Sequence, residues 1–211
     1  MDGNGRWAKK RGLPRNFGHS RGAAVFKAIT EYCATIGIKT LTVYAFSTEN
    51  RNRPKEEVEG IMDLFRDYLR DTSNYLHKNV RTRFIGERED LPEDIIALME
   101  SAEDMTKDYA GMVLNIGIDY GGRDELIHAA NAAAKTGKIT KESLTRHLYA
   151  GSDADLIIRT GGEFRLSNFL LWQSAYAELV FLDKLWPDFK ENDIDEAVDI
   201  FSKRNRRFGK V

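Results

Sequence analysis

The first residues of the chain combine a carboxylate, two glycines and a basic side chain in a pattern that suits phosphate chemistry. They read MDGNGRW and comprise Met1, Asp2, Gly3, Asn4, Gly5, Arg6 and Trp7. Glycines at alternate positions let backbone N–H groups approach an anion closely. The carboxylate of Asp2 repels an anion unless a divalent cation lies between them. The stretch therefore predicts a metal-assisted phosphate or diphosphate site, and the alternative is a simple turn.

Basic side chains recur in four polar segments, which are residues 2–7 with 15–19, residues 47–53, residues 119–123 and residues 159–167. These segments supply Arg6, Arg15, His19, Arg53, Arg159 and Arg165. The guanidinium group presents paired donors that match phosphate oxygens. Any single arginine of this set has a surface ion pair as its alternative role. The whole set fits two phosphate-bearing groups better than one.

Two carboxylates are the candidate metal ligands, Asp2 and Glu178. Glu178 interrupts the apolar run of residues 175–179, and a carboxylate in such a place must be paired or bound to a metal. Oxygen ligands beside phosphates point to Mg²⁺. The alternative for Glu178 is an ion pair with a buried arginine. Phosphate-loop, zinc-protease, nucleophile-elbow and Asp-Asp motifs are all absent, and His19 is the one histidine in a candidate site.

The elements that must position these residues alternate between strands and helices. The pattern predicts strands at about 39–46, 80–86, 112–118, 156–158 and 179–182. It predicts helices at 7–11, 20–36, from Pro54 to about 79, 92–107, 124–135, 141–149, 168–175 and 192–206. Such alternation is typical of one α/β domain with a mainly parallel sheet and helices on both faces. Residues 15–19 read as a polar connection. The polar segments then lie beyond the carboxyl ends of strands, where open α/β sheets bind ligands.

Composition limits the class of protein. The chain has 211 residues, of which 42% are hydrophobic and 31% charged, so it has enough apolar residues for a core. No apolar run reaches membrane-spanning length, and the single cysteine fits a reducing cytoplasm. The net charge is −1, but basic residues gather near both ends. Such clusters attract phosphorylated molecules, and their alternative is a solvated face.

Several long motifs, taken in order, resemble those of the cis-prenyltransferases, or isoprenyl transferases, typified by bacterial undecaprenyl diphosphate synthase. The resemblance runs nearly from end to end. It is carried by residues 2–8 (DGNGRWA), 17–19 (FGH), 44–50 (YAFSTEN) with 52–54 (NRP), 115–116 (NI) with 120–123 (YGGR), 159–163 (RTGGE) with Arg165 and 167–173 (SNFLLWQ), 176–179 (YAEL), 186–189 (WPDF) and 206–209 (RRFG).

The resemblance implies a reaction and assigns residues to it. Successive isopentenyl diphosphate units are added in cis to an allylic diphosphate, usually farnesyl diphosphate, with release of diphosphate. Asp2 matches the catalytic acid and Mg²⁺ ligand, Glu178 a second Mg²⁺ ligand, and Asn50, with Ser47 nearby, the residues that help to remove a proton. Gly3, Asn4, Gly5, Arg6, Arg15 and His19 match the allylic diphosphate site, and Arg159, Arg165 and Ser167 the isopentenyl diphosphate site. The expected substrate-binding set also includes Trp7, Ser47, Thr48, Glu49, Arg51, Arg53 and Leu166.

The resemblance also implies an apolar tunnel, a dimer and a place in the cell. The tunnel is expected between the sheet and the helix after Pro54, with Ala45, Ile61, Met62, Phe65, Leu69, Met112 and Leu114 as lining residues and ordinary core as their alternative role. A homodimer is expected in the cytoplasm. Its long product, expected to be undecaprenyl diphosphate for the cell-wall carrier lipid, implies transient contact with the inner membrane surface.

Three features depart from the pattern of the family. Arg51 stands where many members have tryptophan, so a substrate contact there is altered or electrostatic. Phe164 stands where some members have histidine, which weakens a metal role at that position. Members usually carry a strand just before the Asp-Gly-Asn motif, whereas Asp2 is the second residue of this chain. We therefore expect a strand before Asp2 that this sequence does not contain.

Two other classes of function compete with the enzyme. One is a non-catalytic prenyltransferase-like subunit that binds diphosphate lipids, against which the presence of Asp2, Asn50, Arg159, Arg165 and Glu178 argues. The other is a nucleic-acid-binding protein that uses the basic clusters. We expect no exposed aromatic side chains interleaved with the basic ones, the sequence contains no known nucleic-acid motif, and its net charge is acidic. The sequence therefore predicts no nucleic-acid partner.

Overall fold

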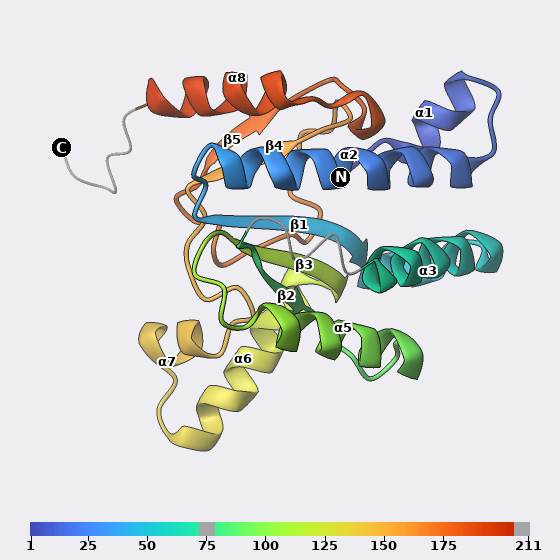
Figure 1. The fold of residues 1–211 in the computed structure, drawn as a ribbon. Helices are drawn as coiled ribbons and strands as arrows, with labels where there is room; N and C mark the ends of the chain where they lie inside the picture. Colours follow the sequence, from blue (N-terminus) through green and yellow to red (C-terminus); the bar gives the residue numbers. More distant parts are fainter. Residues whose placement is uncertain (72–78, 205–211) are drawn as a thin grey trace.

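The computed structural model describes residues 1–71 and 79–204, and Figure 1 shows their arrangement. The helices are α1 (Asn4–Lys10), α2 (Arg15–Thr35), α3 (Lys55–Arg70), α5 (Glu93–Thr106), α6 (Gly122–Thr136), α7 (Lys141–Arg146) and α8 (Glu191–Ser202). The strands are β1 (Thr40–Ser47), β2 (Arg81–Ile85), β3 (Val113–Tyr120), β4 (Leu156–Arg159) and β5 (Glu178–Phe181). Two short 3₁₀ helices, η1 (Thr48–Asn52) and η2 (Trp186–Asp188), follow β1 and precede α8.

The strands form two parallel sheets. In the first sheet the order is β1-β3-β2, with Thr40 opposite Val113 and Arg81 also opposite Val113. The second sheet pairs β4 with β5. Parallel neighbours need crossover connections, and helices supply several of them here. The prediction of an α/β fold with parallel strands and flanking helices is confirmed.

The helices lie on both sides of the strands. Figure 1 shows α2 and α8 above β1, β3 and β2, and α5, α6 and α7 below these three strands. Strand β3 lies between β1 and β2, and its residues from Leu114 to Tyr120 are buried. A strand covered on both faces reads as a continuous apolar run rather than an alternation, which explains the sequence of this strand.

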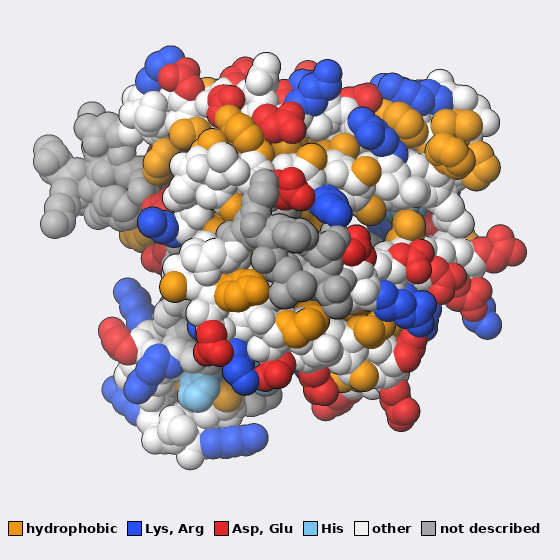
Figure 2. Space-filling view, viewed as in Figure 1, with side chains coloured by type: hydrophobic (Ala, Val, Ile, Leu, Met, Phe, Trp, Pro, Cys, Tyr) orange, Lys and Arg blue, Asp and Glu red, His pale blue; other side chains and the backbone are white. Residues whose placement is uncertain are grey.

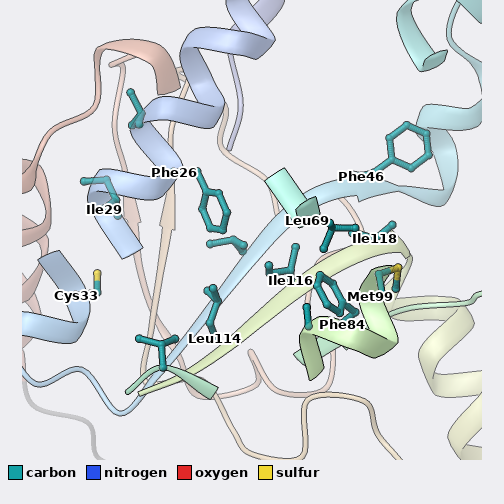
Figure 3. Close-up of a cluster of buried hydrophobic side chains, with 14 of the residues drawn as sticks. Phe26, Ile29, Cys33, Phe46, Leu69, Phe84, Met99, Leu114, Ile116 and Ile118 are labelled. Carbon is teal, nitrogen blue, oxygen red and sulfur yellow. The ribbon is translucent and has the colours of Figure 1, made fainter. Parts of the chain in front are cut away.

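The main core joins the sheet to helices from both sides. Figure 3 shows Phe26, Ile29 and Cys33, which come from α2, near Leu114 and Ile116 of β3. Met99 of α5 belongs to the same cluster and is buried with them. Cys33, the single cysteine of the chain, is thus a small core residue that is 2% exposed.

The helix that begins after Pro54 is amphipathic. Its apolar side chains recur at helical spacing at Val58, Ile61, Met62, Phe65 and Leu69, and all of them pack on the main core. Proline fixes its own backbone angle and lacks an N–H donor, so it suits a position just before a helix. The described part of this helix ends at Arg70, and its expected continuation through residues 72–78 lies outside the described residues, as do residues 205–206 of the last helix.

Two predicted boundaries were wrong. Residues 15–19 are not a connection but the first turns of α2, because the helix begins at Arg15, directly after Pro14 and five residues before the expected start at Ser20. Residues 168–175 form turns rather than a helix. Ser167, Asn168 and Leu170 have positive φ angles of 51°, 63° and 47°, which a right-handed helix excludes. The backbone N–H of Gly122 and that of Arg123 donate to the O and Oδ1 atoms of Asn168, at 2.7 and 2.8 Å, and hold this turn.

Candidate active site

Asp2 lies between two arginines that come from distant parts of the chain. Its Oδ2 atom is 3.0 Å from Nη2 of Arg159, and its Oδ1 atom is 3.2 Å from Nη2 of Arg6. The backbone N–H of Asp2 donates to Oγ1 of Thr160 at 3.1 Å, and its carbonyl accepts from the N–H of Trp186 at 2.9 Å. Burial opposes ionisation of the carboxyl, but the two arginines outweigh burial and lower the pKa of Asp2.

A glycine turn holds Arg6 in place. Gly161 and Gly162 have φ angles of +90° and +70°, a region that favours glycine. A Cβ atom on Gly161 would lie 2.6 Å from Nη2 of Arg6. Arg6 also donates to the carbonyl of Gly161 at 2.7 Å and pairs with Glu163 at 3.2 Å. The two motifs around residues 2–7 and 159–163 are therefore parts of one site.

Arg159 has an unused donor. Its Nη1 atom donates to the carbonyl of Arg165 at 3.3 Å and its Nη2 atom to Asp2. Its Nε atom is buried and, among the described residues, has no hydrogen-bond partner. A buried donor without a partner costs free energy, so an anion that reached this atom would be stabilised. Arg165, which pairs with Glu163 at 2.6 Å, lies nearby.

Glu57 collects a second group of cations. Its carboxylate lies 3.1 Å from Nε of Arg15, 3.2 Å from Nε2 of His19 and 3.1 Å from Nη1 of Arg53. Burial is the largest effect on His19 and lowers its pKa, although Glu57 acts in the opposite direction. Burial raises the pKa of Glu57, but His19 and the arginines outweigh it and lower that pKa.

Sequence reasoning missed Glu57, although a signal exists. Glu57 comes four residues after Arg53, which is near enough along the chain for the two side chains to pair at the start of α3. Its side chain is 7% exposed. Carboxylates are seldom that deeply buried unless they are paired. Only the tertiary structure brings the start of α2 close enough to provide the other two partners.

The residues of the loop after β1 border two different pockets. Ser47, Glu49, Asn50 and Arg53 border the large cavity described below. Asn50 caps η1, because its Oδ1 atom accepts from the N–H of Ser47 at 3.3 Å. Burial raises the pKa of Glu49, but bonds that include one from Asn168 at 2.9 Å outweigh it and lower that pKa.

Thr48 and Arg51 face a smaller pocket instead. Arg51 binds both carboxylate oxygens of Asp119, with a 2.6 Å bond from Nε, and also pairs with Asp90. Asp119 is completely buried and has a φ of +49°. Arg51 therefore forms ion pairs within the protein, and it does not border the large cavity.

Trp7 likewise has a structural environment. Its indole Nε1–H donates to Oδ1 of Asp188 at 2.7 Å, and the guanidinium of Arg11 lies 4.1 Å from the centre of its ring. Trp7 does not border the cavity. Phe164 is 74% exposed and contacts the ring of Phe181 at 5.2 Å. Substrate contacts by Trp7, Thr48 and Arg51 stay predictions, and the geometry gives them no support.

One cavity of about 1770 Å³ brings most of the predicted site residues together. It is bordered by Asp2, Gly3, Asn4, Gly5, Arg6, Arg15, His19, Ser47, Glu49, Asn50, Arg53, Arg159, Arg165, Leu166 and Ser167. Its other walls are apolar and include Ile29, Cys33, Val43, Ile157 and Ile194. The cavity therefore has a cationic part, which suits anionic groups, and an apolar part between β1 and β4.

The position of the expected tunnel stays a prediction. Of the seven expected lining residues, Ala45 and Ile61 border the cavity. The other five belong to the main core or pack against it: Met62, Phe65, Leu69, Met112 and Leu114. The cavity instead runs between β1, β4, α2 and α8. Side-chain size within α3 could not show this, because the same apolar residues serve a core and a tunnel.

Asp2 and Glu178 do not meet within one chain. Glu178 pairs with Arg204 at 2.7 Å and lies opposite Leu156, at the start of β4, whereas Asp2 contacts Arg159 at the end of that strand. In residues 1–71 and 79–204, no three His, Cys, Asp or Glu side chains are placed to hold a metal together. Glu178 thus pairs with an arginine here, but Arg204 is exposed and not the buried arginine of the alternative role. Its role as a metal ligand stays a prediction.

Comparisons with known proteins show the family of this chain. A family model described as "Putative undecaprenyl diphosphate synthase" matches residues 1–209. The chain is 48% identical to an isoprenyl transferase of Aquifex aeolicus and 50% identical to one of Thermotoga maritima; the alignments span 100% and 99% of this chain and 94% of each relative.

A solved structure is also similar. Lavandulyl diphosphate synthase from Lavandula x intermedia, in complex with dimethylallyl diphosphate, aligns with a TM-score of 0.96 and 34% identity over 100% of this chain and 95% of that one. No helix in the described part of the chain is long and apolar enough to cross a bilayer. This chain belongs to the undecaprenyl diphosphate synthase family and is an isoprenyl transferase, an enzyme that transfers prenyl groups.

Proposed function

We propose that this isoprenyl transferase adds isopentenyl diphosphate units in cis to farnesyl diphosphate. The proposed product is undecaprenyl diphosphate, the precursor of a cell-wall carrier lipid. The observation that supports the proposal best is the buried, unpartnered Nε atom of Arg159. Arg159 is one of the residues that border a cavity with a cationic part and an apolar part. The complex of the similar lavandulyl enzyme contains dimethylallyl diphosphate, which is also an allylic diphosphate.

Two groups of cations suit two diphosphates. Arg6, Arg15 and His19 would bind the allylic diphosphate next to Gly3, Asn4 and Gly5. A Cβ atom on Gly5 would lie 2.9 Å from Nη2 of Arg15, so glycine leaves room for that guanidinium. Arg159, Arg165 and Ser167 would bind isopentenyl diphosphate. Each guanidinium exchanges a carboxylate partner for phosphate oxygens, which it binds with similar geometry.

Asp2 is the residue that fits Mg²⁺. Its carboxylate borders the cavity, and Mg²⁺ sites commonly combine one or two carboxylates with substrate phosphates. When bound, Mg²⁺ would stabilise the negative charge that grows on the departing diphosphate. Glu178 of the same chain lies away from this position. We propose it as a ligand only on the strength of the family resemblance.

The reaction breaks the allylic C–O bond, and diphosphate leaves with the electron pair. The double bond of isopentenyl diphosphate supplies electrons for the new C–C bond, and loss of a proton restores a double bond. Arginines aimed at the departing oxygens stabilise the transition state, and apolar walls keep water from the cationic carbon. Asn50, held by its bond to Ser47, is proposed to help remove the proton.

We also propose a homodimer in the cytoplasm, with transient contact to the inner membrane surface through the long lipid product. These proposals rest on the family. A product of undecaprenyl length is too apolar to stay in water, so it must pass to a bilayer.

Incubation with labelled isopentenyl diphosphate, farnesyl diphosphate and Mg²⁺, followed by organic extraction, tests the function. We expect label in a long apolar product whose length chromatography gives. Asp2→Ala or a chelator is expected to abolish it. Asp104→Ala, at an exposed carboxylate that pairs with Lys107 far from the cavity, is the control and should leave the rate unchanged.

A folded protein that binds farnesyl diphosphate but forms no extractable product would support the alternative, a non-catalytic subunit. Isothermal titration with farnesyl diphosphate gives this second readout. A short product would contradict the undecaprenyl length while leaving the chain elongation in place.

A further inference from the structure

The first helical hairpin of the protein carries many cations and no acid. Residues 3–30 contain seven Lys and Arg and not one Asp or Glu. They are Arg6, Lys9, Lys10, Arg11, Arg15, Arg21 and Lys27. A local excess of this size creates a positive potential even though the net charge of the chain is −1.

Part of this charge is not neutralised. Arg11 pairs with Asp188 at 3.4 Å and Lys27 with Asp71 at 3.7 Å. Lys9, Lys10 and Arg21 are exposed, and no carboxylate in the part of the chain that the structure describes forms an ion pair with them. These three cations are free to meet an anionic surface.

An exposed aromatic ring lies among them. Phe17 is 61% exposed, although its neighbour Gly18 is buried against α1. It lies one helical turn before Arg21 on α2, so the two side chains share one side of the helix. Figure 2 shows Lys and Arg side chains together with hydrophobic side chains at the upper right, over α1 and the start of α2.

The same turn borders the cavity. Lys9, Gly12, Leu13, Pro14 and Arg15 all contribute to its rim. Whatever binds the exposed side of this turn therefore lies next to residues that line the cavity. Steering of small anionic substrates would explain the charge but gives no reason for an exposed phenylalanine.

We propose that residues 9–21, the α1–α2 turn, dock the enzyme on an anionic lipid bilayer. Lys9, Lys10 and Arg21 would face the phosphate groups of the lipids, and Phe17 would enter the interfacial layer. Basic side chains beside an aromatic residue are the combination that binds such interfaces. The reason for a membrane rests on the proposed function, because a long polyprenyl product must reach a bilayer.

Vesicle co-sedimentation without substrate tests the docking by itself. We expect the protein to bind vesicles of phosphatidylglycerol and phosphatidylcholine, to bind pure phosphatidylcholine weakly, and to dissociate as salt rises. Lys10→Gln with Arg21→Gln should lower the partition coefficient about 25-fold. Phe17→Ser should lower it roughly tenfold. Both variants should keep the parent's circular dichroism and its activity in detergent.

The control variant uses a similar patch at the other end of the molecule. Lys138, Ile139 and Lys141 are exposed where the chain passes from α6 into α7. Figure 1 shows these two helices at the lower left, away from α1. Lys138→Gln, Ile139→Ser and Lys141→Gln together remove the same kinds of side chain. We expect this triple variant to bind vesicles as the parent does.

Three outcomes would overturn the docking surface: no binding to anionic vesicles, equal binding by the α1–α2 variants, or loss of binding in the control variant alone. Binding of a short DNA duplex that does not depend on Phe17, together with no vesicle binding, would instead indicate a nucleic-acid surface. Vesicle binding by a protein that makes no product would leave the docking in place and contradict only the proposed function.

Discussion

Single carboxylates organise the cations around the cavity. Asp2 holds Arg6 and Arg159, and Glu57 holds Arg15, His19 and Arg53. In both cases the partners come from segments far apart in sequence. Without substrate, the carboxylates compensate charges that would otherwise repel one another. A diphosphate must therefore compete with them, and substitutions of these acids should change substrate affinity as well as stability.

Glu57→Gln is expected to destabilise the protein by about 1–3 kcal/mol, because two arginines and the imidazole of His19 lose their shared carboxylate. The estimate is held low because Arg15 is largely exposed and water screens it. The KM for the allylic diphosphate should change more than the KM for isopentenyl diphosphate. Urea unfolding and steady-state kinetics measure the two effects.

Glu59→Gln is the control on the same helix. Glu59 is exposed and pairs with Lys55 at 3.6 Å, so its loss should cost less than about 0.5 kcal/mol. Equal effects of the two substitutions would show that Glu57 has no special role.

Arg51→Ala is expected to destabilise the protein by about 3 kcal/mol, because it leaves the fully buried Asp119 without its bidentate partner. Asp119→Asn removes the buried charge and should recover part of the loss when the two are combined. A double-mutant cycle in urea measures this coupling.

Arg66→Ala gives the comparison for Arg51, since Arg66 also bridges two acids, Asp63 and Asp94, but at a surface that is largely solvated. We expect a cost of less than about 1 kcal/mol. Additive effects of Arg51→Ala and Asp119→Asn would contradict a stabilising ion pair between Arg51 and Asp119.

Among the elements, α1 and α2 depend on a close contact between backbones. A Cβ atom on Gly18 would lie 2.1 Å from the carbonyl oxygen of Asn4. The first helical turn of α2 can therefore approach α1 only with glycine at this position. The contact places Arg6 of α1 and Arg15 and His19 of α2 around one cavity.

Gly18→Ala is expected to cost about 3 kcal/mol, because backbone atoms cannot yield as a flexible side chain does. Activity should fall together with stability, since α1 carries Arg6. Thermal unfolding and the extraction assay measure the two. Gly151→Ala, which meets no atom within 4 Å, is the control and should leave both unchanged.

The two sheets leave facing edges. Within the described residues, β1 pairs only with β3 and β4 only with β5, and both β1 and β4 border the cavity that Met1 also reaches. We propose that one further parallel strand fits between them and runs into Asp2, as expected from the family. This strand would give both edges the hydrogen bonds that a buried edge needs.

An added segment tests whether the space between β1 and β4, here called the slot, accepts a further strand. A protein extended before Met1 by eight alternating Val and Thr residues should melt at a higher temperature, whereas the same extension with two prolines should not, because proline cannot donate to the ladder. Equal melting temperatures of the two extended proteins would contradict the slot.

For the whole molecule, the buried site makes stability depend on pH. The pKa of His19 is lowered by burial from its ordinary value of 6.5, so the unfolded chain takes up its proton first. Stability is therefore lost as pH falls through 6.5. The lowered pKa values of Asp2, Glu49 and Glu57 add a second loss, as pH falls below about 4.5.

We expect the free energy of unfolding in urea to fall between pH 7 and pH 5, with a slope of at most about 1.4 kcal/mol per pH unit from one group. His19→Gln should flatten this window and leave the loss below pH 4.5. The same substitution at His147, the residue directly after α7, controls for the removal of an imidazole. An unchanged slope in His19→Gln would sink this assignment.

Local sequence patterns predicted many of the strands and helices correctly. The β-branched and aromatic run before Ser47 marked a buried strand, and Pro54 marked the start of a helix. The same rules failed at residues 168–175, where apolar spacing suggested a helix but Ser167, Asn168 and Leu170 take positive φ angles. Those angles are fixed by contacts with Gly122 and Arg123, about 45 residues away.

The sequence by itself determined the family, the α/β class and the set of residues with phosphate chemistry, because motif order, residue type and hydrophobic period are local properties. Only the tertiary structure decided which of those residues share a cavity. It separated Asp2 from Glu178, turned Trp7 and Arg51 toward protein partners, and introduced Glu57. The reason is physical: a charge is paired by whichever opposite charge packing brings within a few ångströms, and packing depends on contacts across the whole chain.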